Sequence, residues 1–435
     1  MEESILVEEI AIIGMSAKFP KANDIVDFWQ NIVNQVNCIS YPSMKRRKNW
    51  DSLLKQYYKV EEITNEMLAY GGFLEGIDEF DGAVFGLSKK EMLGMDSWQR
   101  LMLEMAFTAL EDAGMSGNIV KKSDTGVFIG RDNAYVSSYG AFNNYSQDGV
   151  FEGTYPAILA SRISNVLGLN GPSMVIDTSC SSALVALIQA CYALRYGDCH
   201  MAIVGGINIR ESYIHADEKL NHKIVSDENK IYSFDRRAKG TLISEGAGAI
   251  VIKPYSDAIR DGNHISAIIK GWAINNSGGR SRIMSPSEKA QVEVIRHSWA
   301  NAGISGDTIG YIEAHGTGTL VGDAIELNAI KKAYSIYENS DYSCAVSTVK
   351  SNIGHTVGAS GIASLIKAIM AMKNKKIPCN INFKDLNPFV DLTDSPIYIS
   401  DKIKDWTEKK YPRRCGINSF GFSGVNCHRA LSETQ

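Results

Sequence analysis

The sequence predicts a layered α/β fold built from two similar halves. Apolar, strand-like runs are followed by glycine turns and helices along the chain, an order typical of α/β proteins. One pattern occurs twice: a short strand leads through a polar turn into a helix of small and apolar residues, over 174–196 and again over 345–373. Since a helix that is apolar on every side is buried, we expect these helices back to back, flanked by sheets that outer helices cover. Two ordinary βα units without duplication are the alternative.

Individual elements follow from apolar spacing and from residues that start helices. In residues 1–255, the first half, we expect strands at 10–14, 125–130 and 174–176 and helices at 24–33, 96–113 and 181–196. In residues 256–435, the second half, we expect a strand at 345–347 and a helix at 358–373, and 309–312 is an apolar run. Asp24 is placed to cap its helix, because an aspartate side chain accepts hydrogen bonds from first-turn N–H groups. The halves share one core and therefore form one compact unit.

Composition excludes several classes of function. The 435 residues carry 45 basic and 49 acidic side chains, so there is no basic excess for nucleic acid or for a membrane surface. No apolar run approaches the roughly 18 residues of a membrane span, and the acidic N-terminus does not resemble a signal peptide. The eight cysteines form no CxxC pair, and no HExxH motif is present. We therefore expect no metal, reduced thiols and a cytoplasmic location.

Cys180 is distinguished by its position. It lies at the first turn of the first buried helix, directly after a strand, where unpaired N–H groups and the helix dipole favour a thiolate. A sharp turn there would also expose the sulfur to a cleft. A buried structural cysteine is the alternative, and it fits Cys191 and Cys199 better. From position alone, both interpretations of Cys180 stay open.

Two histidines lie in similarly constrained segments. His315 belongs to 313–319, where glycine and threonine alternate after an apolar run, and His355 ends the polar turn 350–355 before the second buried helix. Taken alone, a histidine in such a segment is more often a hydrogen-bonded core or turn residue than a catalytic one. The remaining six histidines (200, 215, 222, 264, 297 and 428) are interpreted as structural or surface residues.

Three further features could support a site: a lysine before His355, two acidic residues after His315 and a loop near the C-terminus. Lys350 precedes the second buried helix and needs a partner if it is buried. Asp323 and Glu326, eight and eleven residues after His315, are candidates for that partner. The glycine-containing loop 421–424 could turn its N–H groups toward a ligand, although by itself this is a weak signal.

Taken together and in this order, these segments resemble the β-ketoacyl synthases, specifically the ketosynthase domains of polyketide synthases. The matching segments are 10–15, 19–20, 96, 99–101, 171–173, 177–182, 234–235, 313–319, 350–355 and 418–426. The resemblance implies a thiolase-like duplicated fold with five layers, α-β-α-β-α, and a homodimer. It also implies a decarboxylative Claisen condensation in polyketide chain assembly.

The implied reaction assigns a role to each central residue. Cys180 would accept an acyl chain from an acyl carrier protein, and a carrier-bound malonyl group would then lose CO₂ and attack that thioester. His315 and His355 would donate hydrogen bonds to the enolate, and the N–H groups of Cys180 and Phe422 would form an oxyanion hole. No resident cofactor is implied, because the carrier protein supplies the phosphopantetheine arm.

The resemblance also implies supporting roles. Lys350 would sit behind the histidines and pair with Glu326, with Asp323 as a further structural support. Four substrate contacts are implied: Thr317 and Thr319 at the pantetheine arm, and Phe420 and Gly421 in the loop where Phe422 gates the acyl tunnel.

Several positions depart from the family pattern and keep other functions open. Ala324 replaces a usual proline and Ser423 a usual glycine, and the regions 131–135 and 210–229 look unusual, so acyl specificity stays open. A non-elongating ketosynthase that transfers or gates acyl chains is therefore the main alternative. A degradative thiolase, with Cys415 or Cys427 as base, fits the two histidines less well. Papain-like hydrolysis is weaker still, because no Cys-Trp pair surrounds Cys180.

Overall fold

The computed structural model describes residues 8–48, 50–115, 119–133, 150–214, 224–280, 282, 284–337, 343–407 and 411–434. The strands are β1 (Ile10–Lys18), β2 (Gly126–Gly130), β3 (Ser173–Ile176), β4 (Ala202–Asn208), β5 (Gly246–Pro254), β6 (Ala267–Asn276), β7 (Tyr311–Glu313), β8 (Cys344–Ser347), β9 (Lys376–Ile377), β10 (Ile397–Ile399), β11 (Lys404–Asp405), β12 (Arg414–Phe420) and β13 (Val425–Ser432).

The α-helices are α1 (Ile25–Val33), α2 (Met44–Arg47), α3 (Asp51–Tyr58), α4 (Lys89–Gly94), α5 (Ser97–Asp112), α7 (Val150–Thr154), α8 (Ile158–Leu167), α9 (Ser182–Tyr196), α10 (Tyr255–Arg260), α11 (Glu288–Asn301), α12 (Leu320–Tyr334), α13 (Lys350–Ile353) and α14 (Ser360–Lys373). Two 3₁₀ turns bear on the site, η3 (Ser179–Ser181) and η7 (Val357–Ala359). No helix among the described residues is long and apolar enough to cross a membrane.

The main sheet consists of two arrays with the same internal order. Its described strands run β10-β8-β7-β12-β13-β6-β1-β5-β4-β2-β3. Read outward from the centre, the first array is β1-β5-β4-β2-β3 and the second is β6-β13-β12-β7-β8, each with two antiparallel pairings followed by two parallel ones. The second array has one more strand, β10, parallel to β8. The arrays join where Ile10 of β1 lies opposite Ile269 of β6. This repeated order confirms the predicted duplication, while the join makes the two expected sheets continuous.

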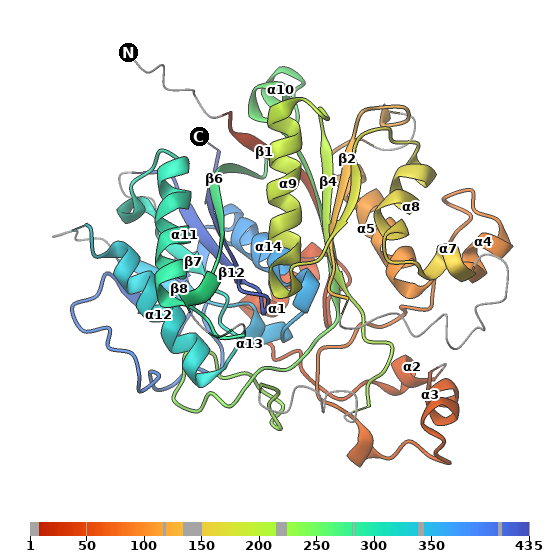
Figure 1. Ribbon diagram of the computed structural model, residues 1–435, viewed down its shortest axis with the longest axis horizontal. Helices are drawn as coiled ribbons and strands as arrows, with labels where there is room; N and C mark the ends of the chain where they lie inside the picture. The colour runs from red at the N-terminus through yellow and green to blue at the C-terminus, as the bar shows by residue number, and fades with distance from the viewer. Residues whose placement is uncertain are drawn as a thin grey trace.

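Five layers are visible in Figure 1. Helices α5 and α8 cover the outer face of the first array, α11 and α12 cover that of the second, and α9 and α14 lie between the arrays. The two central helices approach closely at Gly361, where a Cβ atom would lie 2.9 Å from the backbone N of Leu184. The α-β-α-β-α architecture expected from the sequence is therefore confirmed.

Most predicted elements are present, with two differences. Asp24 caps α1 by accepting the N–H of Asp27 at 2.8 Å, and β1 extends past the expected end to Lys18 because its outer residues also pair with β5. The polar segment 350–355, expected as a turn, contains the short buried helix α13. The unusual regions at 131–135 and 210–229 extend partly into 134–149 and 215–223, which lie outside the described residues.

Candidate active site

Cys180 lies in the turn η3 between β3 and α9, and both halves of the chain hold its backbone. The preceding Ser179 has a φ of +58°, in the left-handed region that non-glycine residues rarely adopt. The carbonyl oxygen of Cys180 accepts hydrogen bonds from Ser360 at 3.2 Å and from Ser419 at 3.0 Å. Because Ser360 begins α14 and Ser419 lies near the end of β12, the position of the sulfur depends on the docking of the two halves.

His355 lies against this sulfur, with its Nε2 3.1 Å from Cys180 Sγ. Its backbone N–H donates to the Leu242 carbonyl at 2.8 Å, and its Nδ1 accepts the N–H of Val357 at 3.2 Å. Since a neutral imidazole has one donor and one acceptor nitrogen, the proton is on Nε2. Val357 holds this contact with a φ of +41°, which is strained for a β-branched residue. His355 therefore presents a hydrogen-bond donor to Cys180.

His315 faces the same space from the loop after β7. Its ring centroid lies 5.7 Å from that of His355, and the rings are nearly perpendicular. Its Nδ1 accepts the N–H of Phe420 at 3.4 Å, which again leaves the proton on Nε2. Burial, followed by the positive charge of Lys350, holds the pKa of both histidines well below the ordinary value. The site thus contains two neutral imidazoles whose Nε2 atoms act as donors.

Two buried carboxylates shape the loop that carries His315. Glu326 accepts the N–H groups of His315 and Gly316, each at 2.7 Å. Asp323 accepts those of Phe234 at 2.7 Å and Gly318 at 3.1 Å. Burial raises the pKa of Glu326, and it raises the pKa of Asp323 to about 7. Both carboxylates therefore stabilise the backbone of the loop, and their hydrogen bonds do not involve the Cys180 sulfur.

The expected ion pair between Lys350 and Glu326 is absent. The carboxylate oxygens of Glu326 accept hydrogen bonds from backbone N–H groups and from the side chain of Asn418. The Lys350 Nζ is buried without a hydrogen-bond partner among the described residues. Burial lowers the pKa of Lys350, while the nearby negative charges of Glu313 and Glu326 raise it. Lys350 therefore acts on the site through its charge at a distance and not through a direct pair.

A different buried pair lies beneath the segment that carries Lys350. Lys367 of α14 pairs with Glu313 at 2.8 Å, and both side chains are fully buried. The other carboxylate oxygen of Glu313 accepts the N–H of Val349 at 2.6 Å. The hydroxyl of Tyr311 also donates to Glu313. The pair thus ties β7, which leads to His315, to the turn that begins α13.

The protonation of Cys180 differs from the expectation of a readily formed thiolate. Burial raises the pKa of the Cys180 thiol. The hydrogen bond with Ser179, the charge of Lys350 and the backbone N–H of Phe422 act in the opposite direction. The Phe422 backbone lies near enough to lower the thiol pKa slightly, while the dry surroundings favour the neutral thiol at rest.

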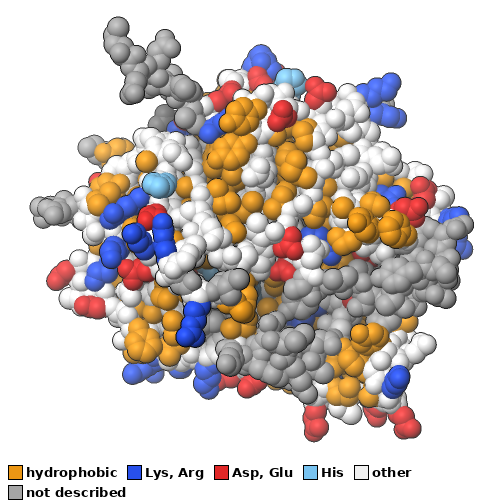
Figure 2. Space-filling model, in the orientation of Figure 1, with side chains coloured by type: hydrophobic (Ala, Val, Ile, Leu, Met, Phe, Trp, Pro, Cys, Tyr) orange, Lys and Arg blue, Asp and Glu red, His pale blue; other side chains and the backbone are white. Residues whose placement is uncertain are grey.

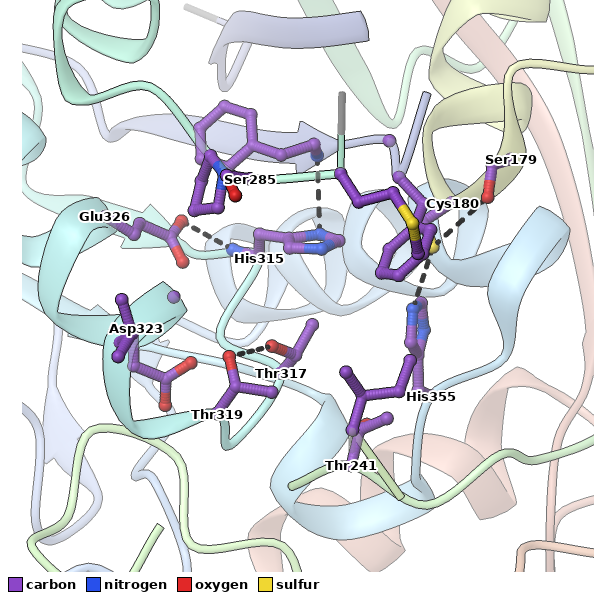
Figure 3. Close-up of a pocket in the computed structure, with 18 of the residues that line it drawn as sticks. Ser179, Cys180, Thr241, Ser285, His315, Thr317, Thr319, Asp323, Glu326 and His355 are labelled. Atoms are coloured by element: carbon purple, nitrogen blue, oxygen red, sulfur yellow. Dashed lines mark hydrogen bonds between the residues drawn. The ribbon is translucent and has the colours of Figure 1, made fainter. Parts of the chain in front are cut away.

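A cavity of about 620 Å³ unites these groups. Figure 3 shows Cys180, His315 and His355 facing one another, with Thr317 and Thr319 together on another side of the cavity. The hydroxyls of Thr317 and Thr319 lie 3.2 Å apart. Of the residues singled out from the sequence, these line it: Cys180, His315, His355, Thr317, Thr319, Asp323, Glu326, Phe420, Gly421 and Phe422. Lys350 lies outside the lining.

Sequence reasoning missed two residues that hold the backbone of Cys180, Ser360 and Ser419. Ser419 lies inside the matched segment 418–426, so the sequence did contain a signal. Its contact with the Cys180 carbonyl could not be predicted, because the two residues are 239 positions apart in the chain. Among the described residues, no group of three or more His, Cys, Asp and Glu side chains could hold a metal ion.

Family models match the chain in two consecutive segments. Residues 7–258 match the "Beta-ketoacyl synthase, N-terminal domain", and residues 266–384 match the "Beta-ketoacyl synthase, C-terminal domain". The first segment contains Cys180, and the second contains both histidines.

Curated relatives extend this similarity along nearly all of the chain. Polyketide synthase PksN of Bacillus subtilis is 37% identical over 98% of the chain, and polyketide synthase PksR of the same organism is 36% identical over 98%. The aligned region is only 8% of the first protein and 16% of the second. The chain therefore corresponds to a small part of each of these synthases.

Solved structures agree in fold as well as in sequence. The ketosynthase from module 6 of the bacillaene synthase of Bacillus subtilis has a TM-score of 0.86 and 34% identity, covering 98% of this chain and 72% of that one. The oxazolomycin ketosynthase domain OzmH KS7 of Streptomyces albus has a TM-score of 0.89 and 30% identity, covering 98% and 76%. With the duplicated thiolase-like fold and the Cys180, His315 and His355 cluster, these matches show that the chain belongs to the β-ketoacyl synthase family, as a ketosynthase of the polyketide synthase type.

Proposed function

We propose that the chain catalyses a decarboxylative Claisen condensation between an acyl group on Cys180 and a malonyl group on an acyl carrier protein. The observation that carries the proposal is the pair of neutral histidines in one cavity with Cys180, each with Nδ1 occupied by a backbone N–H. Two donors fixed in this way can stabilise a developing enolate oxygen without first losing or gaining a proton.

The first step would be acyl transfer to Cys180. The sulfur attacks the carbonyl carbon of an acyl thioester, the bond from that carbon to the carrier sulfur breaks, and the proton lost by Cys180 is taken up by the departing carrier thiolate. The N–H groups of Cys180 and Phe422 would stabilise the tetrahedral oxyanion, in keeping with the place of both residues in the cavity lining. Loss of one such donor typically costs about 10²–10³ in rate.

The second step would extend the chain by two carbons. The malonyl thioester loses CO₂, and the electron pair of the broken C–C bond forms an enolate whose oxygen accepts hydrogen bonds from His315 and His355. The enolate carbon then attacks the acyl-Cys180 carbonyl, and the Cys180 thiolate leaves. The positive charge of Lys350 acts on Cys180 as well as on the histidines, and it would favour that departure.

The binding partner would be an acyl carrier protein, and no resident cofactor is required. The hydroxyls of Thr317 and Thr319 line the cavity and could bind the amide groups of a phosphopantetheine arm, which the carrier brings with it. Phe420 and Gly421, which also line the cavity, would contact the incoming thioester.

A two-stage assay tests this function. The chain is first loaded with an acyl-pantetheine thioester, then mixed with malonyl-carrier protein, and both proteins are weighed by intact mass spectrometry. We expect acyl-Cys180 in the first stage and a carrier-bound β-ketoacyl product in the second, with neither in Cys180→Ala. Acylation without decarboxylation across several acyl groups would contradict condensation and favour the non-elongating alternative.

We also propose that the chain forms a homodimer through the face that carries β3 and the end of α9. Among the described strands, β3 is the edge of the first array. Met174 on it is 39% exposed, and Tyr196 of α9 is 81% exposed. Figure 2 shows hydrophobic side chains gathered over α9. An open strand edge beside apolar side chains favours pairing with a second copy.

Light scattering tests the dimer. We expect a dimer mass for the wild type and for the control Ile336→Lys, which changes an exposed residue, and a monomer mass for Met174→Lys. A monomeric wild type would contradict the proposal.

A further inference from the structure

His428 is a fully buried histidine that the sequence analysis placed among the structural residues. It lies on β13 directly opposite Asn418 of β12 in the antiparallel ladder. Its Nδ1 is 2.6 Å from the Asn418 Oδ1, and its Nε2 is 3.2 Å from the Trp299 Nε1. Each ring nitrogen therefore has its own hydrogen-bond partner.

The direction of each hydrogen bond follows from Trp299. An indole N–H can only donate, so the Nε2 of His428 accepts from Trp299. Burial lowers the pKa of His428 to about 3, which leaves the ring neutral with its single proton on Nδ1. That proton is donated to the Oδ1 of Asn418, and this fixes the orientation of the Asn418 amide.

Asn418 passes this orientation to the active-site loop. With its oxygen facing His428, its Nδ2 donates to Glu326 Oε1 at 2.8 Å. The same carboxylate accepts the backbone N–H groups of His315 and Gly316. A continuous series of hydrogen bonds thus runs from Trp299 through His428, Asn418 and Glu326 to His315.

The strand that carries Asn418 also contacts the site at its next two positions. Ser419 donates to the Cys180 carbonyl, and the Phe420 N–H donates to the Nδ1 of His315. A rotation of the Asn418 amide would place its oxygen against the Glu326 carboxylate, where two acceptors repel each other. Glu326 and the His315 loop would then shift, and a misplacement of about 1 Å can cost on the order of 10² in rate.

We propose that His428 is a positioning residue that fixes the orientation of Asn418 and, through Glu326, the place of His315 in the cavity. The proposal rests on the proposed function in that decarboxylation is the step that uses His315. A histidine that only fills the core beside Trp299 would instead affect stability and all steps together.

A matched pair of substitutions separates these roles. His428→Asn keeps a side-chain N–H near the position of Nδ1 and can still donate to Asn418. His428→Gln keeps an acceptor near the position of Nε2 for Trp299 but loses the donor to Asn418. Both remove the ring and leave a buried amide, so they share the cost of the lost packing.

Two half-reactions and one spectrum provide the measurement. Cys180 acylation and malonyl decarboxylation are timed separately, and the ring ¹⁵N shifts of His315 are recorded in the resting protein. We expect His428→Asn to stay within about threefold of wild type in both steps. We expect His428→Gln to slow decarboxylation by about 10- to 100-fold, to leave acylation within about threefold, and to shift the His315 ring signals.

Equal loss of both steps in His428→Gln, equal behaviour of the two variants, or unchanged His315 ring shifts in His428→Gln would overturn the proposal. Should His428→Gln not fold, Asn418→Leu, which has nearly the same shape without polar atoms, must show the same split. If the wild type does not decarboxylate malonyl-carrier protein, condensation fails, while the ring shifts still decide the role of His428.

Discussion

The Nε2 of His355 lies 3.1 Å from the Sγ of Cys180, and Cys180 lies in the turn η3 of one half while His355 lies two residues before the turn η7 of the other. Each is followed by a central helix, α9 or α14, that begins after a 3₁₀ turn. Each of these turns starts with a residue in the left-handed region, Ser179 in one and Val357 in the other. The duplicated fold therefore brings the two turns together between the arrays, and the contact of Cys180 with His355 is a contact between the halves.

The first prediction concerns the donor at His355. His355→Leu should slow malonyl decarboxylation by about 10²–10³-fold, the usual effect of losing one oxyanion donor. His355→Gln should lose less, since its amide can place an N–H near the position of Nε2. Release of CO₂ from malonyl-carrier protein by the acylated enzyme measures both. Equal rates in the two variants would show that the N–H is not what matters.

The second prediction concerns the reactivity of Cys180. All eight cysteines are free and buried, but only Cys180 lines the cavity. Iodoacetamide should therefore label the wild type once, at Cys180, and should not label Cys180→Ala. Because burial raises the thiol pKa, the labelling rate should still be rising at about pH 8.5, the ordinary thiol value. Peptide mapping by mass spectrometry checks the site, and a rate plateau at lower pH would contradict the raised pKa.

The third prediction concerns the charge of Lys350. That charge lowers the pKa of both active-site histidines after the larger effect of burial. Lys350→Met removes the charge, so the protonated imidazole becomes less unfavourable and both histidine pKa values should rise. A pH titration of ¹⁵N-histidine-labelled protein reports each ring separately. Lys376→Met, at a surface pair, is the control and should leave both values where they are; unchanged values in Lys350→Met would contradict the prediction.

The fourth prediction concerns the buried pair of Lys367 and Glu313. Lys367→Met leaves the Glu313 carboxylate buried without its cation, which typically costs about 3–5 kcal/mol of unfolding free energy. The control Lys376→Met breaks the exposed pair of Lys376 with Asp405 and should lower the unfolding free energy by no more than about 1 kcal/mol. Urea denaturation of the three proteins gives the comparison. Similar losses in both variants would mean that the buried pair does not hold β7 and the α13 turn together.

The sequence by itself predicted the duplicated strand–turn–helix pattern and the buried central helices and, through the family resemblance, Cys180, His315 and His355 as candidate site residues. These features are local, since apolar spacing, a cap such as Asp24 and a short motif each lie within one stretch of chain. The tertiary structure alone decided three points. It shows which ring nitrogen of His315 and His355 carries the proton, that Lys350 does not pair directly with Glu326, and that hydrogen bonds connect His428 to the His315 loop. Each of these depends on hydrogen bonds between segments from different strands and helices, which the spacing of residues along the chain does not encode.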